Sequence, residues 1–327
     1  MALQESKYIW KNGKLLPWQE ATVHVMSHAL HYGSSVFEGI RVYATPGGPA
    51  AFRLPEHIDR LFDSARIHRM PMPYDRDVLL AACEQAVVAN DLDSAYLRPI
   101  VFRGVGGLGL VAGDDVTTEV VVAAVSWGRY LGEEAMERGV DVAVTSWQRP
   151  APNTIPALAK AGGNYLSGAL ISSEAKRHGY GEGIALSTDG LVSEGAGENL
   201  FVVRDQVLHT PPVAASILGG ITRDSVIRMA ADMNLEVREH PMPREMLYLA
   251  DELFFTGTAA EITPIRSVDG IVARAGGRGP ITAALQDRFF GLFAGTTPDQ
   301  YGWLTPFKSQ SQPSNVQEMP HVANAVR

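Results

Sequence analysis

Residues 153–165 read Asn153-Thr-Ile-Pro-Ala-Leu-Ala-Lys160-Ala-Gly-Gly-Asn-Tyr165, which places one lysine among small, uncharged residues and just before two glycines. An amine in such a setting loses hydration, and desolvation lowers the pKa of a lysine because it disfavours the ammonium form. A neutral amine is a nucleophile towards aldehydes. The alternative is a loop lysine that points to solvent, which is the commoner situation for lysine.

A second candidate is the carboxylate of Glu194, in the run Ser193-Glu-Gly-Ala-Gly-Glu-Asn199. The run follows a predicted hairpin over 184–193, and its small residues would let a ligand approach closely. Pyridoxal phosphate has an aldehyde for the Lys160 amine and needs an acid at its pyridine nitrogen. Glu198 is equivalent by composition, and for either residue a turn carboxylate facing water stays the alternative.

Two short stretches are candidate anion sites. Gly219-Gly-Ile-Thr222 precedes a predicted helix, where free N–H groups and the helix dipole favour a phosphate. The alternative is that Thr222 is only the helix N-cap. Gly257-Thr258-Ala259, at the end of a predicted strand, is a second possible nest of N–H groups.

Two competing patterns fail on context. Gly104-Val-Gly106-Gly-Leu-Gly109 matches the dinucleotide fingerprint, but the following residues lead into another predicted strand rather than a helix. His24, His28 and His31 have no accompanying carboxylate or cysteine cluster, so we expect structural histidines and no metal site.

Composition indicates an ordinary globular protein. The 327 residues include 46% apolar and 20% charged residues, and the net charge of -8 argues against nucleic acid or an anionic membrane as a partner. The only cysteine, Cys83, lies in an apolar run, and no apolar run of about 18 residues or signal peptide is found. We expect a soluble, cytoplasmic protein.

The predicted elements describe an α+β protein. Asn12-Gly13 predicts a hairpin turn, residues 37–43 a strand, and Pro55 the first residue of a helix whose apolar stripe leaves Arg60 to one side. Further helices are predicted over 76–89, 163–177, 221–233 and 280–293, and further strands over 95–103, 116–127, 139–147, 199–203, 206–210, 235–239 and 252–256. The predicted domains are 1–130, a loop over 131–138, and 139–306, with 307–327 a mobile tail.

Several stretches together resemble one family. They are Val23-His-Val-Met-Ser-His-Ala-Leu-His-Tyr-Gly33, Val36-Phe-Glu-Gly-Ile-Arg41, Ala151-Pro-Asn-Thr-Ile-Pro156, Ala159-Lys-Ala-Gly-Gly-Asn-Tyr-Leu-Ser167, Val192-Ser-Glu-Gly-Ala-Gly-Glu-Asn-Leu-Phe201, Gly220-Ile-Thr-Arg-Asp224 and Gly257-Thr-Ala-Ala-Glu-Ile-Thr-Pro264. From Tyr8 to about Trp303 the chain resembles the branched-chain amino acid aminotransferases of the bacterial type, which are pyridoxal-phosphate enzymes of fold type IV. The resemblance implies a small sandwich-like N-terminal domain and a larger pseudo-barrel C-terminal domain.

By this resemblance Lys160 would bind the cofactor covalently, Glu194 would pair with its pyridine nitrogen, and Tyr165 would bind its phenolic oxygen. The phosphate would be bound by Arg60, Ile221, Thr222 and Thr258. Tyr96 and the N–H groups of Thr258 and Ala259 would bind the substrate α-carboxylate, and Arg98 the second carboxylate of glutamate. Apolar side chains would lie against Phe37, Gly39, Trp127, Tyr130 and Tyr165. Tyr32 and Leu110 would come from a neighbouring subunit, so at least a homodimer is implied.

The activity that the resemblance implies is transfer of the amino group of L-leucine, L-isoleucine or L-valine to 2-oxoglutarate. The alternatives of the same fold are a D-amino acid or (R)-amine transaminase and aminodeoxychorismate lyase, and one of another class is a non-catalytic binding protein that keeps the cofactor site. The sequence departs from the bacterial pattern in the glycine-rich loop 104–115 and in a longer tail after Phe307.

Overall fold

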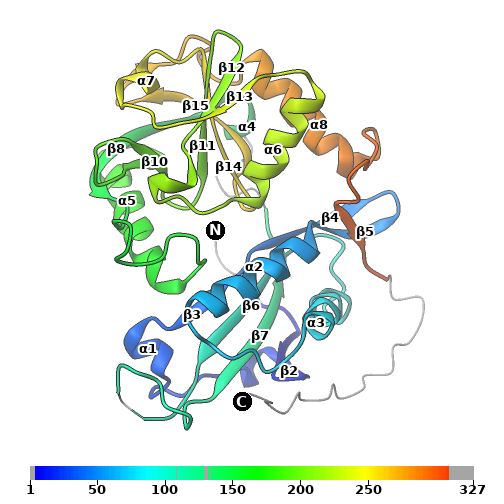
Figure 1. The fold of residues 1–327 in the computed structure, drawn as a ribbon. Helices are drawn as coiled ribbons and strands as arrows, with labels where there is room; N and C mark the ends of the chain where they lie inside the picture. Colours follow the sequence, from blue (N-terminus) through cyan, green and yellow to red (C-terminus); the bar gives the residue numbers. More distant parts are fainter. Residues whose placement is uncertain (1–3, 108, 129–131, 133, 309–327) are drawn as a thin grey trace. The chain divides into compact units, whose positions relative to one another are not determined.

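The computed structural model describes residues 4–107, 109–128, 132 and 134–308 (Figure 1). These residues form two compact units that are not consecutive in sequence. The first unit contains the described residues up to Trp127, residues 159–163, and those from Phe293 onwards. The second contains the described residues of Gly128–Leu158 and Asn164–Leu292.

An antiparallel sheet forms the centre of the first unit, in the order β17-β5-β4-β6-β7-β1-β2, with β3 paired to β6. Its described strands are β1 (Tyr8–Lys11), β2 (Lys14–Pro17), β3 (Ser35–Phe37), β4 (Ile40–Thr45), β5 (Gly48–Phe52), β6 (Ala95–Arg103), β7 (Thr118–Val125) and β17 (Leu304–Pro306). The predicted first hairpin is confirmed, because Asn12 and Gly13 both have positive φ, at 48° and 91°.

Two helices, α2 (Leu54–Ile67) and α3 (Arg76–Val88), pack on this sheet (Figure 1). The apolar stripe predicted for α2 is confirmed, since Ile58, Leu61 and Ala65 are fully buried in the first unit's core. Asp75 caps α3 by accepting a hydrogen bond from the Val78 N–H. The short α1 (His28–Tyr32) and the 3-10 turn η1 (Trp18–Glu20) complete the described helices that lie wholly within this unit.

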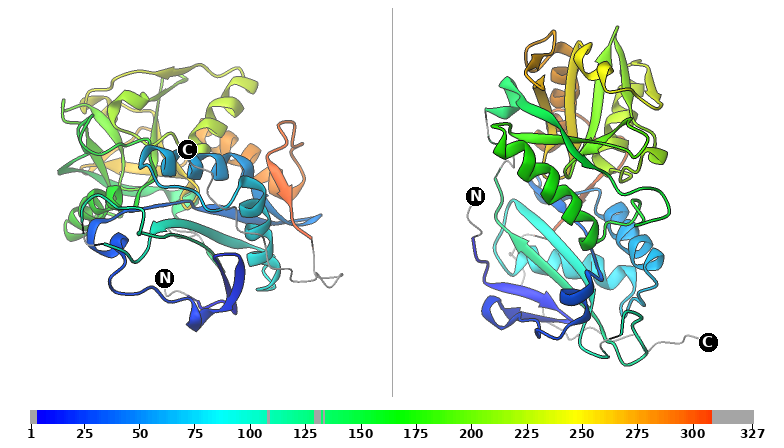
Figure 2. Two further views of the ribbon diagram at one scale, coloured as in Figure 1. Left: turned by 60° about the horizontal axis from the view of Figure 1, so that its bottom comes forward. Right: turned by 90° about the vertical axis from the view of Figure 1, so that its left-hand side faces the viewer.

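A mixed sheet forms the centre of the second unit (Figure 2). Its strand order is β10-β9-β8-β15-β14-β11-β12-β13, with β16 paired to β15. Its described strands are β8 (Val140–Gln148), β9 (Glu182–Leu186), β10 (Val192–Gly195), β11 (Asn199–Arg204), β12 (Val207–Thr210), β13 (Val237–Glu239), β14 (Glu252–Gly257), β15 (Glu261–Val268) and β16 (Ile271–Val272). β8 runs parallel to both of its neighbours, whereas the β9–β10, β11–β12 and β14–β15 pairs are antiparallel.

The helices of the second unit flank this sheet. They are α4 (Ala135–Arg138), α5 (Tyr165–Arg177), α6 (Ile221–Asp232), α7 (Glu245–Tyr248) and α8 (Pro280–Ala294), whose last two residues are counted with the first unit. Of the remaining 3-10 turns, η3 (Val213–Ala215) belongs to the second unit, and η2 (Gly162–Asn164) begins in the first unit and ends in the second. α8 begins on a buried carboxylate: Glu252 accepts from the N–H groups of Ile281 and Thr282 at 3.0 and 2.8 Å. Among the described helices, none has the length and apolar character needed to cross a membrane.

One predicted strand is interrupted. Residues 37–43 were expected to be continuous, but β3 ends at Phe37 and β4 begins at Ile40, although both pair with β6 in one register. The residue opposite Glu38 in that register is Pro99, which accepts from the Glu38 N–H but has no N–H to return. The strands β5, β15, β16 and β17 and the helices α4 and α7 were not predicted. The predicted tail, from Phe307 on, lies outside the described residues after Lys308.

Candidate functional site

Lys160 is fixed through its backbone to two elements of the first unit. Its N–H donates to Ser64 Oγ of α2 at 3.0 Å, and its carbonyl accepts from the Phe37 N–H at 3.0 Å. The next residue, Ala161, bridges to Val36 of β3. These contacts bring the short segment 159–163 beside β3 and α2.

The Lys160 amine lies in a desolvated, charged setting. Burial lowers the pKa of Lys160, and the guanidinium of Arg60 lowers it further, while Glu38 acts in the opposite direction. The Nζ atom is 5.1 Å from the centroid of the Phe37 ring. The solvent-facing alternative for this lysine is therefore wrong: the residue is half-buried and its pKa is shifted towards the nucleophilic, neutral form.

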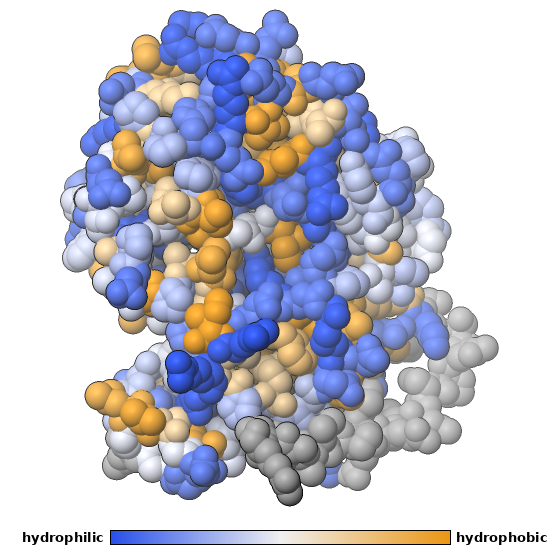
Figure 3. All heavy atoms as spheres, viewed as in Figure 1, coloured by the Kyte–Doolittle hydropathy of each residue, from blue (hydrophilic) through white to orange (hydrophobic). Residues whose placement is uncertain are grey.

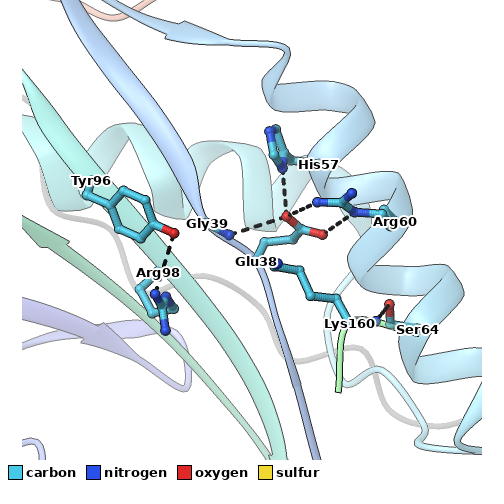
Figure 4. A network of polar contacts seen from close by, with 8 residues as sticks. All are labelled: Glu38, Gly39, His57, Arg60, Ser64, Tyr96, Arg98 and Lys160. Carbon is cyan, nitrogen blue, oxygen red and sulfur yellow. Dashed lines mark hydrogen bonds and ion pairs between the residues drawn. The ribbon is translucent and has the colours of Figure 1, made fainter. Parts of the chain in front are cut away.

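Arg60, which the helix pattern left beside the apolar stripe, projects into the same region (Figure 4). Its side chain is only 14% exposed and forms a bidentate ion pair with Glu38, Nε to Oε1 at 2.6 Å and Nη2 to Oε2 at 2.8 Å. His57, one turn earlier on α2, approaches Glu38 Oε2 with Nδ1 at 2.6 Å. Sequence reasoning assigned no role to Glu38 or His57.

Predicted substrate residues gather on the sheet beside this network. The Arg98 guanidinium lies 4.7 Å from the Phe37 ring centroid and 5.2 Å from that of Tyr96, and its Nη2 is 3.5 Å from the Tyr96 hydroxyl. The Tyr96 and Trp127 rings are 5.1 Å apart. A Cβ at Gly39 would fall 1.8 Å from Tyr96 Oη, so any larger residue there would have to displace the Tyr96 side chain.

Glu194 is the centre of a separate network in the second unit. It lies on β10, is 5% exposed, and forms an ion pair with Arg149 at 2.8 Å. Its Oε2 also accepts from Asn199 Nδ2 and from the Leu218 N–H, both at 3.1 Å. The water-facing alternative is therefore wrong for Glu194, and also for Glu198, which is 6% exposed.

The other predicted residues of the second unit surround the 194–198 stretch. A Cβ at Gly197 would touch the Tyr165 ring at 3.8 Å, and one at Gly257 would meet Glu198 Cγ at 3.7 Å. Tyr165 and the turn 257–259 thus lie against the same stretch. Each contact belongs to the second unit alone.

The start of α6 is a helix N-terminus within the second unit. Its N-cap is Gly220, without a side-chain cap, so the alternative that Thr222 is the N-cap is wrong. Thr222 lies within the first turn and is 3% exposed. Asn199 joins this terminus to Glu194, because it also donates to the Leu218 carbonyl at 2.9 Å. The N–H groups of Ile221 and Thr222 are at the positive end of the helix dipole.

Three predicted positions stand apart. Tyr130 lies outside the described residues. Tyr32 on α1 is 41% exposed, and Leu110, in the loop between β6 and β7, is 81% exposed. The glycine-rich loop 104–115 connects β6 to β7 without a helix in its described part, as expected. His28 is engaged by the fold, with Ser34 Oγ at 2.7 Å and the Gly109 carbonyl at 3.1 Å.

The network residues that sequence reasoning missed are Glu38, His57, Ser64, Arg149 and Asn199. A partial signal existed for Glu38. A carboxylate that lies on an apolar strand, between two predicted pocket residues, must either be exposed or be buried together with a cation. His57, Arg60 and Ser64 are spaced to share one helix face. No comparable signal pointed to Arg149, because only tertiary pairing brings it to Glu194.

The two networks contain the groups that an aldehyde cofactor with a phosphate needs: an amine, a buried carboxylate, a guanidinium and a helix N-terminus. Residues 35–268 match the family model for amino-transferase class IV. The chain therefore belongs to the class IV aminotransferase family.

Its similarity to particular members is high. The branched-chain-amino-acid aminotransferase of Salmonella typhimurium is 56% identical over 309 residues, which cover 94% of this chain and 100% of that protein. The solved branched-chain amino acid aminotransferase of Escherichia coli is 56% identical, with a TM-score of 0.91 over 92% of this chain and 99% of that one. The branched-chain amino acid aminotransferase of Thermobaculum terrenum, solved in its PLP form, is 37% identical, with a TM-score of 0.86 over 92% and 98%. The predicted family and the mixed α+β fold of type IV are confirmed.

Proposed function

We propose that this chain transfers the amino group of L-leucine, L-isoleucine or L-valine to 2-oxoglutarate, giving branched-chain 2-oxo acids and L-glutamate. The observation that carries the proposal is Lys160, whose amine is desolvated and whose backbone is held by Ser64 and Phe37, in a chain of the aminotransferase family. The choice of substrate is supported by 56% identity to relatives named branched-chain-amino-acid aminotransferases. The D-amino acid, (R)-amine and lyase alternatives find no support in these relatives.

The cofactor is pyridoxal 5'-phosphate, the form in which the Thermobaculum terrenum relative was solved. When bound, it supplies an electron sink that makes the substrate Cα–H acidic. Lys160 would hold the cofactor through Nζ and would take the substrate Cα proton at the same atom. Its lowered pKa serves both roles, because only the neutral amine is a nucleophile and a base.

The remaining cofactor contacts follow from the chemistry of each side chain. Glu194 would hold the protonated pyridine nitrogen, and its ion pair with Arg149 and bonds from Asn199 and Leu218 would keep the carboxylate in one orientation. Tyr165 would donate its phenol to the cofactor's phenolic oxygen. The cofactor phosphate would be bound by the Arg60 guanidinium, by the N–H groups of Ile221 and Thr222 at the start of α6, and by Thr258.

Substrate binding would depend on two groups of β6. Tyr96 would bind the α-carboxylate together with the N–H groups of Thr258 and Ala259. Arg98 would bind the second carboxylate of glutamate and 2-oxoglutarate. The side chains of leucine, isoleucine and valine would lie against a largely aromatic surface, formed by Phe37, Gly39, Trp127, Tyr130 and Tyr165.

The proposal includes a homodimer at least, in which Tyr32 and Leu110 reach a neighbouring subunit's substrate. Val25, Leu30 and Val111 are 71%, 64% and 88% exposed around these two residues, and the His28 bond to the Gly109 carbonyl joins α1 to the loop. In Figure 3 an apolar group protrudes at the lower left, where Figure 1 places α1. Exposed apolar surface of this kind favours burial against another chain.

A cytoplasmic location is also proposed, with the free, buried Cys83 in its support.

The first experiment is to add L-leucine alone to the purified holoenzyme and record its visible spectrum. We expect the absorbance of the lysine-bound cofactor to disappear and 2-oxoglutarate to restore it, because the two half-reactions of a ping-pong transfer are separable. A response to D-alanine or an (R)-amine but not to leucine would refute the substrate assignment. Bound cofactor without turnover of any amino acid would identify a binding protein instead.

A further inference from the structure

Glu38 is a fully buried carboxylate to which the proposed function gives no task. It lies between Phe37 and Gly39, two proposed pocket residues, and its side chain points towards α2 (Figure 4). Burying a charge is costly unless it is paired, and replacing a buried ion pair by apolar residues is often neutral for stability. Stability alone therefore gives no reason for this carboxylate.

Both carboxylate oxygens of Glu38 are engaged by α2. Arg60 donates Nε to Oε1 and Nη2 to Oε2, and His57 donates Nδ1 to Oε2 at 2.6 Å. Burial lowers the pKa of His57, and because an ionised carboxylate can only accept, Nδ1 of His57 is the donor to Glu38. Burial would raise the pKa of Glu38, but Arg60 and His57 outweigh it and hold that pKa well below its usual range. The pair is an ionised carboxylate against an ionised guanidinium.

The same helix face also holds the lysine. His57, Arg60 and Ser64 recur at the spacing that aligns side chains on one side of a helix, and Ser64 accepts the Lys160 N–H. From the other direction, Phe37, the residue before Glu38, donates its N–H to the Lys160 carbonyl. The Arg60 guanidinium and the Lys160 backbone are thus both held by residues of one face of α2.

The ion pair with Glu38 holds one edge of the Arg60 guanidinium. A guanidinium has five N–H donors in a fixed plane, and the pair with Glu38 uses two of them. Fixing one edge of that plane sets the direction of the rest. A cation oriented in advance binds an anion better, because ordering its side chain costs nothing at the moment of binding.

We propose that Glu38, supported by His57, is a positioning residue that fixes the Arg60 guanidinium for the cofactor phosphate and balances its charge beside Lys160. The inference rests on the proposed function, in which Arg60 binds that phosphate. Glu38 touches neither the substrate nor the reacting atoms. It acts through Arg60.

The positioning part is tested with Glu38→Asp, which keeps the charge but shortens the side chain by one methylene, so that the bidentate geometry is lost. Full-length apoenzyme is titrated with pyridoxal 5'-phosphate and, separately, with pyridoxal, which lacks the phosphate. We expect the dissociation constant of pyridoxal 5'-phosphate to rise about tenfold, the effect of weakening one charge-assisted hydrogen bond. That of pyridoxal should change by less than about twofold. His57→Asn, a milder change, should also raise the dissociation constant of pyridoxal 5'-phosphate relative to that of pyridoxal.

The charge part is tested with Glu38→Gln. The charged and titratable groups around the Lys160 amine are Arg60, Glu38, Tyr96, Arg98 and His57. The Glu38 carboxylate is ionised at neutral pH. Because its carboxylate opposes the lowering of the Lys160 pKa, Glu38→Gln should move the pH profile of pyridoxal addition to lower pH. A merely structural role would leave that profile unchanged.

Two controls separate the outcomes. Glu252→Asp shortens another buried carboxylate, at the start of α8, and should leave the ratio of the two dissociation constants unchanged. Arg60→Gln should reduce the preference for the phosphorylated cofactor at least as much as Glu38→Asp does, because the other phosphate donors remain. If Arg60→Gln reduces it while Glu38→Asp preserves it, Glu38 does not position Arg60 and this inference is overturned. If Arg60→Gln also preserves it, the phosphate assignment itself fails, and the inference fails with it.

Discussion

Gly39 lies where the ring of Tyr96 leaves no space for a side chain. A Cβ at position 39 would be 1.8 Å from Tyr96 Oη and 2.6 Å from its Cζ, whereas ordinary contact begins at 3.4 Å. Gly39→Ala should therefore displace the phenol oxygen by about 1.6 Å. Because Tyr96 is the proposed partner of the α-carboxylate, which all substrates share, the displacement should affect every substrate.

The size of the effect follows from the bond that is lost. A hydrogen bond to a charged group contributes about 1.5–3 kcal/mol, so kcat/KM should fall roughly 10- to 100-fold for both L-leucine and 2-oxoglutarate. Overpacking should also lower the free energy of unfolding by about 1–3 kcal/mol. Steady-state kinetics with each substrate varied in turn, and denaturant unfolding, measure the two effects.

Gly47→Ala is the matched control, because a Cβ there would meet only Thr45 Oγ1 at 3.7 Å. Its kcat/KM should stay within about twofold of the wild type. In a Tyr96→Phe background, Gly39→Ala should cost less than in the wild type, since the hydroxyl that it displaces is already gone. Wild-type kcat/KM for Gly39→Ala would refute both the tight Gly39–Tyr96 contact and the role of Tyr96.

Three further substitutions test other parts of the molecule. Arg98→Leu should lower kcat/KM for 2-oxoglutarate by about 10- to 100-fold but much less for L-leucine, because only the dicarboxylate needs the guanidinium; equal losses would contradict this in substrate-panel kinetics. Lys160→Met should make the apoenzyme more resistant to denaturant near pH 7. The folded-state pKa of Lys160 is lowered, so the unfolded chain binds more protons up to the ordinary value of 10.5, and the wild type gains stability as pH rises through that window. The advantage of the variant should shrink towards pH 10.5, and a constant difference would contradict the shift. Glu252→Ala should lower the free energy of unfolding by roughly 2–3 kcal/mol, because the buried N–H of Thr282 loses its acceptor, with full activity per folded molecule.

The local part of the fold was predictable because its signals are local. Asn12-Gly13 specifies a tight hairpin turn, and Ile58, Leu61 and Ala65 recur at helical spacing. The break after Phe37 was not predictable in this way, because it depends on Pro99, which lies opposite only after β6 has paired with β3 and β4. Pairing between strands so far apart in the chain leaves no trace in the periodicity of either strand.

The site was partly predictable for the same reason. Small residues around Lys160 and Glu194 indicated where a ligand can approach, and the desolvation of Lys160 is found as expected. The alternative that Thr222 is the N-cap of α6 was wrong, because Gly220 is the N-cap and the helix begins at Ile221; a threonine near a helix start is consistent with either position. The partners of the buried charges were missed altogether.

The sequence by itself determined the kind of chemistry: a lysine in a setting without charges, a carboxylate among glycines, and motifs typical of one family. Only the tertiary structure decided which charges neutralise one another. It returns residues 159–163 to the first unit, pairs Glu38 with Arg60, and pairs Glu194 with Arg149. A buried charge is stable only when an opposite charge or a hydrogen-bond donor lies within a few ångströms. Such distances are properties of the folded chain and not of the order of its residues.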